Sequence, residues 1–137
     1  MPRLACVERL FMKISFEIIN VSQLANESVD FKMLIFKFDL GSSLDLNNAR
    51  DLGIFFETLI RGGVLKILVN MRGIEYIDSA GIAVLINSAK QMKTVNGSIV
   101  LANVPNDIKA LFKTINLQKF MKIFNLEAEA VDFFRYV

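Results

Sequence analysis

The sequence predicts an α/β fold in which strands and helices alternate along the chain. Short apolar runs rich in Ile, Val, Leu and Phe recur, as expected of buried strands. Between these runs, apolar residues recur at spacings of three and four, the period of an amphipathic helix. We therefore expect a mixed β-sheet of about four to five strands, with about four helices packed largely on one side.

The first half of the chain begins with two paired strands, Lys13–Val21 and Phe31–Phe38, joined by a turn at Asn26-Glu27-Ser28. An amphipathic helix from Leu46 to Arg61 follows, and Gly62-Gly63 ends it. Its expected inner face carries Leu46, Ala49, Leu52, Phe56, Leu59 and Ile60.

The run Val64 to Met71 is almost wholly apolar and predicts a central strand. A second helix, from Ser79 to Val95, ends at Asn96-Gly97 and is followed by a buried strand, Ser98–Ala102. The inner face of this helix should carry Ile82, Leu85, Ile86, Ala89 and Met92.

The last third of the chain predicts two more helices around a short strand. Pro105 opens the first of them, and a strand around Lys122–Phe124 precedes a final helix from Glu127 to Arg135. The helix after Pro105 places Ile108, Leu111, Phe112 and Ile115 on its apolar template.

With 137 residues the chain suits one domain, which we expect to span residues 12–137. Residues 1–11 are expected to form a poorly ordered N-terminal extension, with Met12 as the true start. Glu8 and Arg9 interrupt the apolar character that a signal peptide would need, and no apolar run approaches the ~18 residues of a membrane span. The single cysteine, Cys6, fits a reducing compartment. We expect a cytoplasmic protein.

The composition excludes most familiar enzyme chemistry. Histidine is absent, so the chain has no Ser-His-Asp system, no histidine phosphorelay and no His-ligated metal site, and one cysteine cannot build a zinc site. Gly62-Gly63 lacks the context of a phosphate-binding loop. The net charge is +2 and the basic residues are scattered, unlike a nucleic-acid footprint. We expect no enzyme activity, no cofactor, no metal and no direct nucleic-acid partner.

The most informative stretch is Ile77-Asp78-Ser79-Ala80-Gly81, between the central strand and the second helix. Ser79 sits where the helix should begin, near unpaired backbone N–H groups and the positive end of the helix dipole. A phosphate on its hydroxyl would be held by those groups. The plainer interpretation is that Ser79 is only an N-cap and Asp78 a second capping or turn residue. No nucleophile elbow accompanies Asp78 and Ser79, which argues against a serine hydrolase.

This stretch resembles the signature of the STAS domain of bacterial anti-sigma factor antagonists, in which Asp-Ser-(Ser/Thr/Ala)-Gly precedes a Leu/Ile-rich helix. The similarity extends from about Met12 to the C-terminus, including Asn103-Val104-Pro105 and the stretch Leu117 to Phe124. The resemblance implies a STAS-like sheet and a partner switch. Unmodified, the protein would bind an anti-sigma factor serine kinase; that kinase would phosphorylate Ser79 and so be released, and a PP2C-type phosphatase would reverse the step. The protein would be a monomer or a weak dimer.

The same resemblance gives a set of partner-binding residues: Asp45, Asp78, Ser79, Ala80 and Gly81. Family members carry Gly-Glu-Leu-Asp before the first helix; here Leu44-Asp45 matches, but the Gly and Glu match only after a one-residue shift. Asp45 is equally explained as an ordinary N-cap. Gly81 would allow close approach of a backbone or partner, or serve plain helix–sheet packing. An alternative function is a STAS adaptor subunit of a membrane transport assembly, in which Ser79 is only a cap.

Overall fold

A six-stranded mixed sheet organises the part of the chain that the computed structural model describes, residues 3–8, 13–21 and 33–136. Its strand order is β1-β2-β3-β5-β7-β8. The first three strands are antiparallel neighbours, and the rest run parallel to β3. The strands are β1 (Arg3–Glu8), β2 (Lys13–Asn20), β3 (Leu34–Asp39), β5 (Lys66–Asn70), β7 (Ser98–Ala102) and β8 (Lys122–Phe124).

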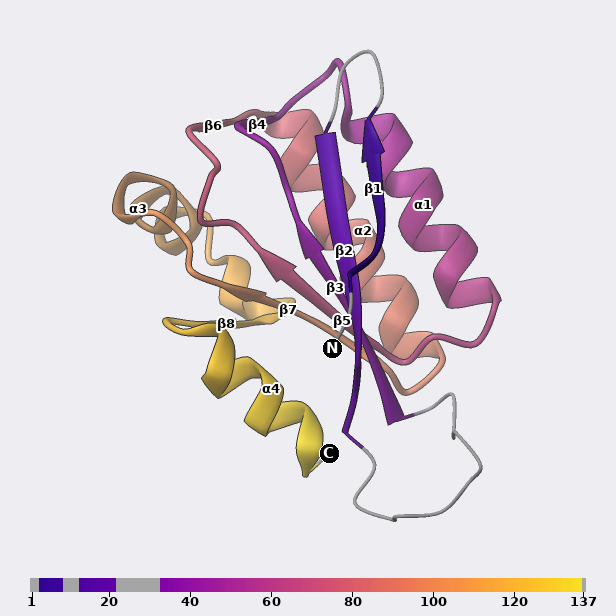
Figure 1. The fold of residues 1–137 in the computed structure, drawn as a ribbon. Coiled ribbons are helices and arrows are strands. Elements are labelled where there is room, and N and C mark those ends of the chain that lie inside the picture. Colours follow the sequence, from indigo (N-terminus) through magenta and orange to yellow (C-terminus); the bar gives the residue numbers. More distant parts are fainter. Residues whose placement is uncertain (1–2, 9–12, 22–32, 137) are drawn as a thin grey trace.

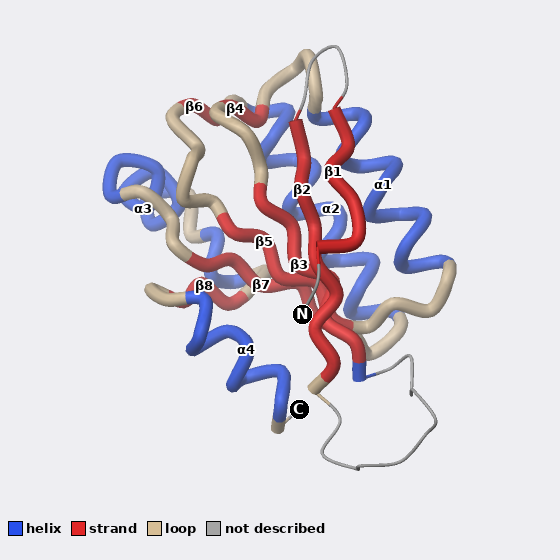
Figure 2. The backbone as a smooth tube through the Cα atoms, viewed as in Figure 1, coloured by secondary structure: helices blue, strands red, loops and turns tan. Residues whose placement is uncertain are grey.

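Helices cover both faces of this sheet, unequally (Figure 1). α1, α2 and α3 contribute to the larger core on one face, whereas α4 packs on the opposite face over a smaller core that includes Leu68 and Val100. Figure 2 shows the strands as a layer between these two groups. The helices are α1 (Ala49–Arg61), α2 (Ser79–Thr94), α3 (Asn106–Thr114) and α4 (Glu127–Arg135).

The two-residue side-chain period of β3 explains how one strand serves both faces. Phe36 and Phe38 belong to the core under α1 and α2, while Ile35 belongs to the core under α4. Phe38 is fully buried and meets the rings of Phe55 and Phe56 edge-on, at centroid distances of 5.5 and 5.2 Å. These aromatic contacts fix α1 over the centre of the sheet.

A buried lysine fastens α4 to its face of the sheet. The Nζ atom of Lys37 lies 2.8 Å from Glu127 Oε1 at the start of α4, and also 3.7 Å from Asp39 and 3.9 Å from Glu17. Asn70 Nδ2 donates to the other oxygen of Glu127 at 3.0 Å. Burial by itself would lower the pKa of Lys37, but the hydrogen bond to Glu127 and the three carboxylate charges outweigh it, so the pKa is raised above its usual value.

The predicted α/β class, the mixed sheet and the grouping of helices largely on one side are confirmed, but the number of strands differs. The main sheet has six strands, more than the four to five expected, because residues 3–8 form β1 and pair with β2. Residues 3–8 therefore extend the sheet, in contrast to the poorly ordered extension expected for residues 1–11. The turn expected at Asn26-Glu27-Ser28, and the start of the strand expected from Phe31, lie outside the described residues.

The sequence prediction also misplaced some apolar residues of the helices. α1 begins at Ala49 instead of Leu46, and the Leu46 side chain is 78% exposed in the turn that precedes the helix. In α3, Ile108 is buried, but Leu111 is exposed, as is Ile115 just after the helix. The period was correct in both helices, but the apolar stripe is narrower than the sequence suggested.

Candidate functional site

A small second sheet brings two distant loops together at the start of α2. β4 (Ser43–Leu44) pairs in parallel with β6 (Tyr76–Ile77). The carbonyl of Ser42 accepts the backbone N–H of Glu75 at 2.7 Å, which anchors the pairing. β4 leads towards α1 and β6 leads directly into α2. The residues after β4 and the residues that open α2 therefore share one end of the molecule (Figure 1).

Asp78 joins these two loops through both oxygens of its carboxylate. It is the N-cap of α2, where Oδ1 accepts the Gly81 N–H at 3.1 Å. Its Oδ2 accepts the Leu46 N–H at 2.9 Å, and its own N–H donates to the Leu44 carbonyl at 3.2 Å. The hydrogen bond from Gly81 lowers the pKa of Asp78 below its usual value; partial burial opposes this, and the bonds from Leu46 and Ala80 reinforce it. Asp78 is thus an ionised clamp at neutral pH.

Ser79 is the first residue of α2 and is exposed, directly after β6 and Asp78. Its expected position at the start of the helix is confirmed, but the cap is Asp78, so the interpretation of Ser79 as an N-cap is wrong. Within the described residues, the Ser79 hydroxyl has no hydrogen-bond partner. The fold therefore leaves this hydroxyl directed to no protein group, while the neighbouring carboxylate does the capping.

Gly81 shows why the two loops can approach α2 so closely. A Cβ atom at this position would lie 2.5 Å from the Leu44 carbonyl oxygen, 2.8 Å from Leu44 Cγ and 2.9 Å from Ile77 Cγ1. Contacts under about 3 Å are repulsive, so only glycine fits without displacement. Gly81 is buried and Ala80 is half-buried. Gly81 therefore shapes the surface around Ser79 from beneath, through close approach of a backbone, which was one of its expected roles.

Asp45 stabilises the turn between β4 and α1. Its Oδ1 accepts the Asn47 N–H at 2.9 Å, and its N–H donates to Asn48 Oδ1 at 2.9 Å. Asn48 is buried and its Nδ2 donates to the Ser43 carbonyl at 2.9 Å. Asp45 thus caps a turn instead of α1 itself, whose N-cap is Asn48. Since Leu44 and Leu46 both bond to Asp78, Asp45 lies beside the start of α2.

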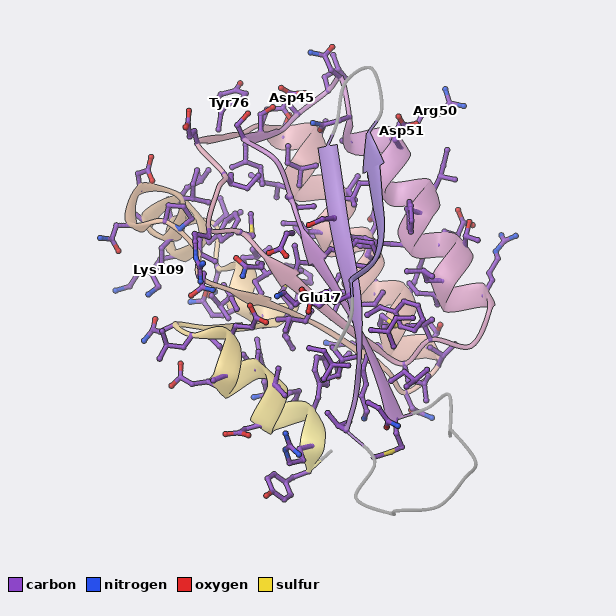
Figure 3. The ribbon with its side chains drawn as sticks, viewed as in Figure 1. Glu17, Asp45, Arg50, Asp51, Tyr76 and Lys109 are labelled. Carbon is purple, nitrogen blue, oxygen red and sulfur yellow. The ribbon has the colours of Figure 1, made fainter. Side chains whose placement is uncertain are left out.

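Two exposed apolar side chains at this end were missed by sequence reasoning. Leu46 is 78% and Tyr76 is 57% exposed, although residues of their kind usually contribute to cores. Figure 3 shows Tyr76 and Asp45 at the same end of the molecule. Leu46 fits the helical spacing of α1, so the sequence predicted it to be buried. The run Asp45-Leu46-Asn47-Asn48, which is rich in turn-forming residues, could have indicated that Leu46 lies in a turn. Together, Asp45, Leu46, Tyr76, Asp78 and Ser79 form what we call the α2-start surface.

The α2-start surface has the chemistry of a contact and modification site. It contains the Ser79 hydroxyl without a hydrogen-bond partner among the described residues, the Asp78 carboxylate that caps α2, and the exposed side chains of Leu46 and Tyr76. Among the described residues, no group of three or more Cys, Asp or Glu residues is placed to hold a metal ion. No helix in the same part of the chain is long and apolar enough to cross a membrane.

The STAS domain family matches residues 26–130. A Thermotoga neapolitana protein, described as a candidate anti-sigma factor antagonist and a homologue of TM1081, is 27% identical over 77 residues, which cover 56% of this chain and 68% of that protein.

Solved structures share the fold at low sequence identity. The crystal structure of TM1081 from Thermotoga maritima, also a candidate anti-sigma factor antagonist, superposes with a TM-score of 0.74 at 20% identity, covering 88% of this chain and 92% of that one. Phosphorylated SpoIIAA, a Bacillus cell fate determinant, gives a TM-score of 0.61 at 20% identity, covering 85% and 96%.

The fold also occurs in a sulfate transporter family protein from Wolinella succinogenes, with a TM-score of 0.66 at 12% identity over 74% of this chain and 85% of that one. The family match spans most of the chain and includes both β4 and the whole start of α2. On that match, this chain belongs to the STAS domain family, with a fold of the anti-sigma factor antagonist type.

Proposed function

We propose that this protein is a cytoplasmic, non-enzymatic partner switch, in which Ser79 is the phosphorylation site and the α2-start surface binds an anti-sigma factor serine kinase. The observation that supports the proposal is that Asp78, and not Ser79, caps α2. Because Asp78 caps the helix, the exposed Ser79 hydroxyl makes no hydrogen bond to any of the described residues. A serine placed there is available to an enzyme that transfers phosphate.

In the unmodified state, the surface would dock the kinase through apolar contact. Leu46 and Tyr76 supply exposed apolar area near the start of α2, and burying such side chains at an interface is favourable by about 25 cal/mol per Å². Hydrogen bonds from backbone N–H groups to Asp45 and Asp78 hold the turn that carries Leu46 in place without the partner. A preformed surface binds with a smaller ordering cost.

Phosphorylation would act on the partner and not on the fold. Free backbone amides hold a phosphate at a helix start, but the Asp78 carboxylate already accepts the Gly81 amide of α2, together with the Leu46 amide of the neighbouring turn. The added charge of about −1.5 to −2 would therefore project outward beside an ionised carboxylate. Placing an unpaired charge in a docked interface costs several kcal/mol, and about 1.4 kcal/mol already weakens binding tenfold. The kinase would be released.

This proposal is tested by incubating the purified protein with its genomically neighbouring anti-sigma kinase and Mg-ATP, then mapping phosphate by mass spectrometry. We expect one phosphate, at Ser79, and its removal by a PP2C-type phosphatase. Ser79→Ala should take up none, whereas Ser88→Ala, a buried serine on the same helix, should be modified like the parent. Modification at another residue, or none, would refute the assignment.

A second candidate is a STAS adaptor of a membrane transport assembly, favoured by the shared fold of the Wolinella transporter protein. In that case the α2-start surface would hold a transport protein permanently, and its affinity would not depend on phosphate at Ser79. Affinity capture with the purified chain separates the candidates: recovery of a transporter subunit supports the adaptor, and recovery of a serine kinase supports the switch.

A further inference from the structure

A pocket of about 230 Å³ lies at the end of α2 opposite Ser79. Its walls come from the last turns of α2, the beginning of β7, the segment that leads into β8, and the Phe133 ring of α4. A helix of sixteen residues is about 24 Å long, so this pocket is separate from the α2-start surface. Its β7 wall begins at Ser98 and Ile99, before the pairing with β8 starts at Val100.

The charge around this pocket is one-sided. Lys93, Lys119 and Lys122 line it, and no Asp or Glu does. None of the salt bridges within the described ranges involves these lysines. The chain as a whole is nearly balanced, with 16 basic and 14 acidic residues. A pocket with three cations and no carboxylate therefore concentrates positive potential that the overall composition does not explain.

Aromatic rings give the pocket a second chemical character. Phe120 and Phe133 line it together with the apolar side chains of Ile99 and Met121. The ammonium of Lys122 lies 5.6 Å from the centroid of the Phe133 ring. Such cation–π contacts hold a long flexible side chain near the wall. Polar donors also reach the pocket from Ser98 and Gln118.

We propose that this pocket binds a small organic phosphate, with the phosphate among the three lysines and an aromatic or apolar part against Phe120 and Phe133. A phosphate carries about −1.5 to −2 charges at neutral pH. As the anionic group of a ligand, it therefore matches several ammonium groups better than a carboxylate with a single charge would. The volume admits a ligand near the size of one phosphorylated ring and is smaller than the usual pocket for a drug-sized molecule. This proposal does not depend on the phosphorylation of Ser79.

The test is a titration of the full ¹⁵N-labelled chain with phenyl phosphate, followed by backbone amide NMR shifts. We expect saturable shifts at Gly97, Ser98 and Ile99, and none at Ser79 or Gly81. Inorganic phosphate should bind more weakly and phenol should not bind, because each lacks one half of the recognised group.

Matched lysine variants separate a built pocket from general attraction. Lys93→Gln and Lys119→Gln should each weaken phenyl phosphate binding about tenfold, the loss expected for one charged hydrogen bond. Lys113→Gln removes the same charge from exposed α3, outside the pocket, and should leave the affinity unchanged. Absence of saturable shifts, or an equal loss of affinity in all three variants, would overturn the proposal. The lysines would then serve only to prevent the edge strand β8 from pairing with another chain.

Discussion

Replacing Gly81 by alanine should force α2 away from the loop that carries Leu44. The new Cβ would lie 2.5 Å from a backbone carbonyl oxygen and under 3 Å from two side-chain carbons. The carbonyl cannot rotate aside, since Leu44 belongs to β4 and its oxygen also accepts the Asp78 N–H. The helix start and β4 would have to separate, which would stretch the bond from Leu46 to Asp78.

The expected cost combines two opposing terms. Inserting a methyl group into a packed site costs about 1–3 kcal/mol, and exchanging glycine for alanine in a helix returns about 0.5–1 kcal/mol. We expect Gly81→Ala to lower the free energy of unfolding by about 1–2 kcal/mol, because the clash is with backbone. For a chain of this length, that corresponds to a melting temperature lower by roughly 4–8 °C.

Gly53→Ala is the matched control on α1. A Cβ there would meet Val84 at 3.6 Å, an ordinary contact, so the helix-propensity gain of about 0.5–1 kcal/mol should appear undiminished. Urea unfolding of both variants measures the difference directly. If Gly81→Ala were as stable as Gly53→Ala, the close approach of α2 to β4 would be wrong, and with it the geometry of the α2-start surface.

Three further substitutions, one of them with a matched control, test other contacts. Lys37→Met should cost about 2–3 kcal/mol in urea unfolding, because it removes the buried ammonium that offsets the charges of its carboxylate partners, whereas Arg61→Met in an exposed pair should cost under about 0.5 kcal/mol. The Lys37 pKa is raised on folding, so its contribution should hold below about pH 10 and decline only as the pH rises through the folded-state pKa. Asp45→Ala should weaken kinase binding while costing about 1 kcal/mol of stability; unchanged affinity would make Asp45 a turn residue only. Because the Asp78 pKa is lowered, the ionised carboxylate stabilises the fold and this contribution is lost in acid. The melting temperatures of Asp78→Asn and the parent should therefore converge as the pH falls below the usual pKa of an aspartate.

The parts of the fold that depend on local pattern could be predicted from the sequence. The apolar runs of β5 and β7 and the spacing of Leu85, Ala89 and Met92 in α2 gave these elements correctly. The small β4–β6 sheet could not be predicted, because each strand has only two residues and their pairing is set by tertiary contact. The exposure of Leu46 depends on that same pairing.

The sequence predicted the position of the candidate site but not the hydrogen bonds that hold it together. The motif around Ser79 marked the start of α2, yet pattern alone could not decide which of two adjacent polar residues would cap the helix. The hydrogen bonds of Asp78 to Gly81 and Leu46 decide it, and the second of these spans 32 positions in the chain. No local rule anticipates such a bond. β1 escaped prediction for a related reason, since an edge strand is defined by its partner.

In the proposed switch, phosphate on Ser79, and not the serine itself, controls kinase binding. The direct test is isothermal titration of the kinase with the parent protein, Ser79→Ala and Ser79→Asp. Since Ser79 caps nothing in the described structure, both variants should keep the melting temperature of the parent. Ser79→Ala should bind with the parent's affinity, whereas Ser79→Asp should bind at least about tenfold more weakly, a loss of about 1.4 kcal/mol. A Ser79→Asp variant that binds the kinase as tightly as the parent would contradict the switch and favour the adaptor.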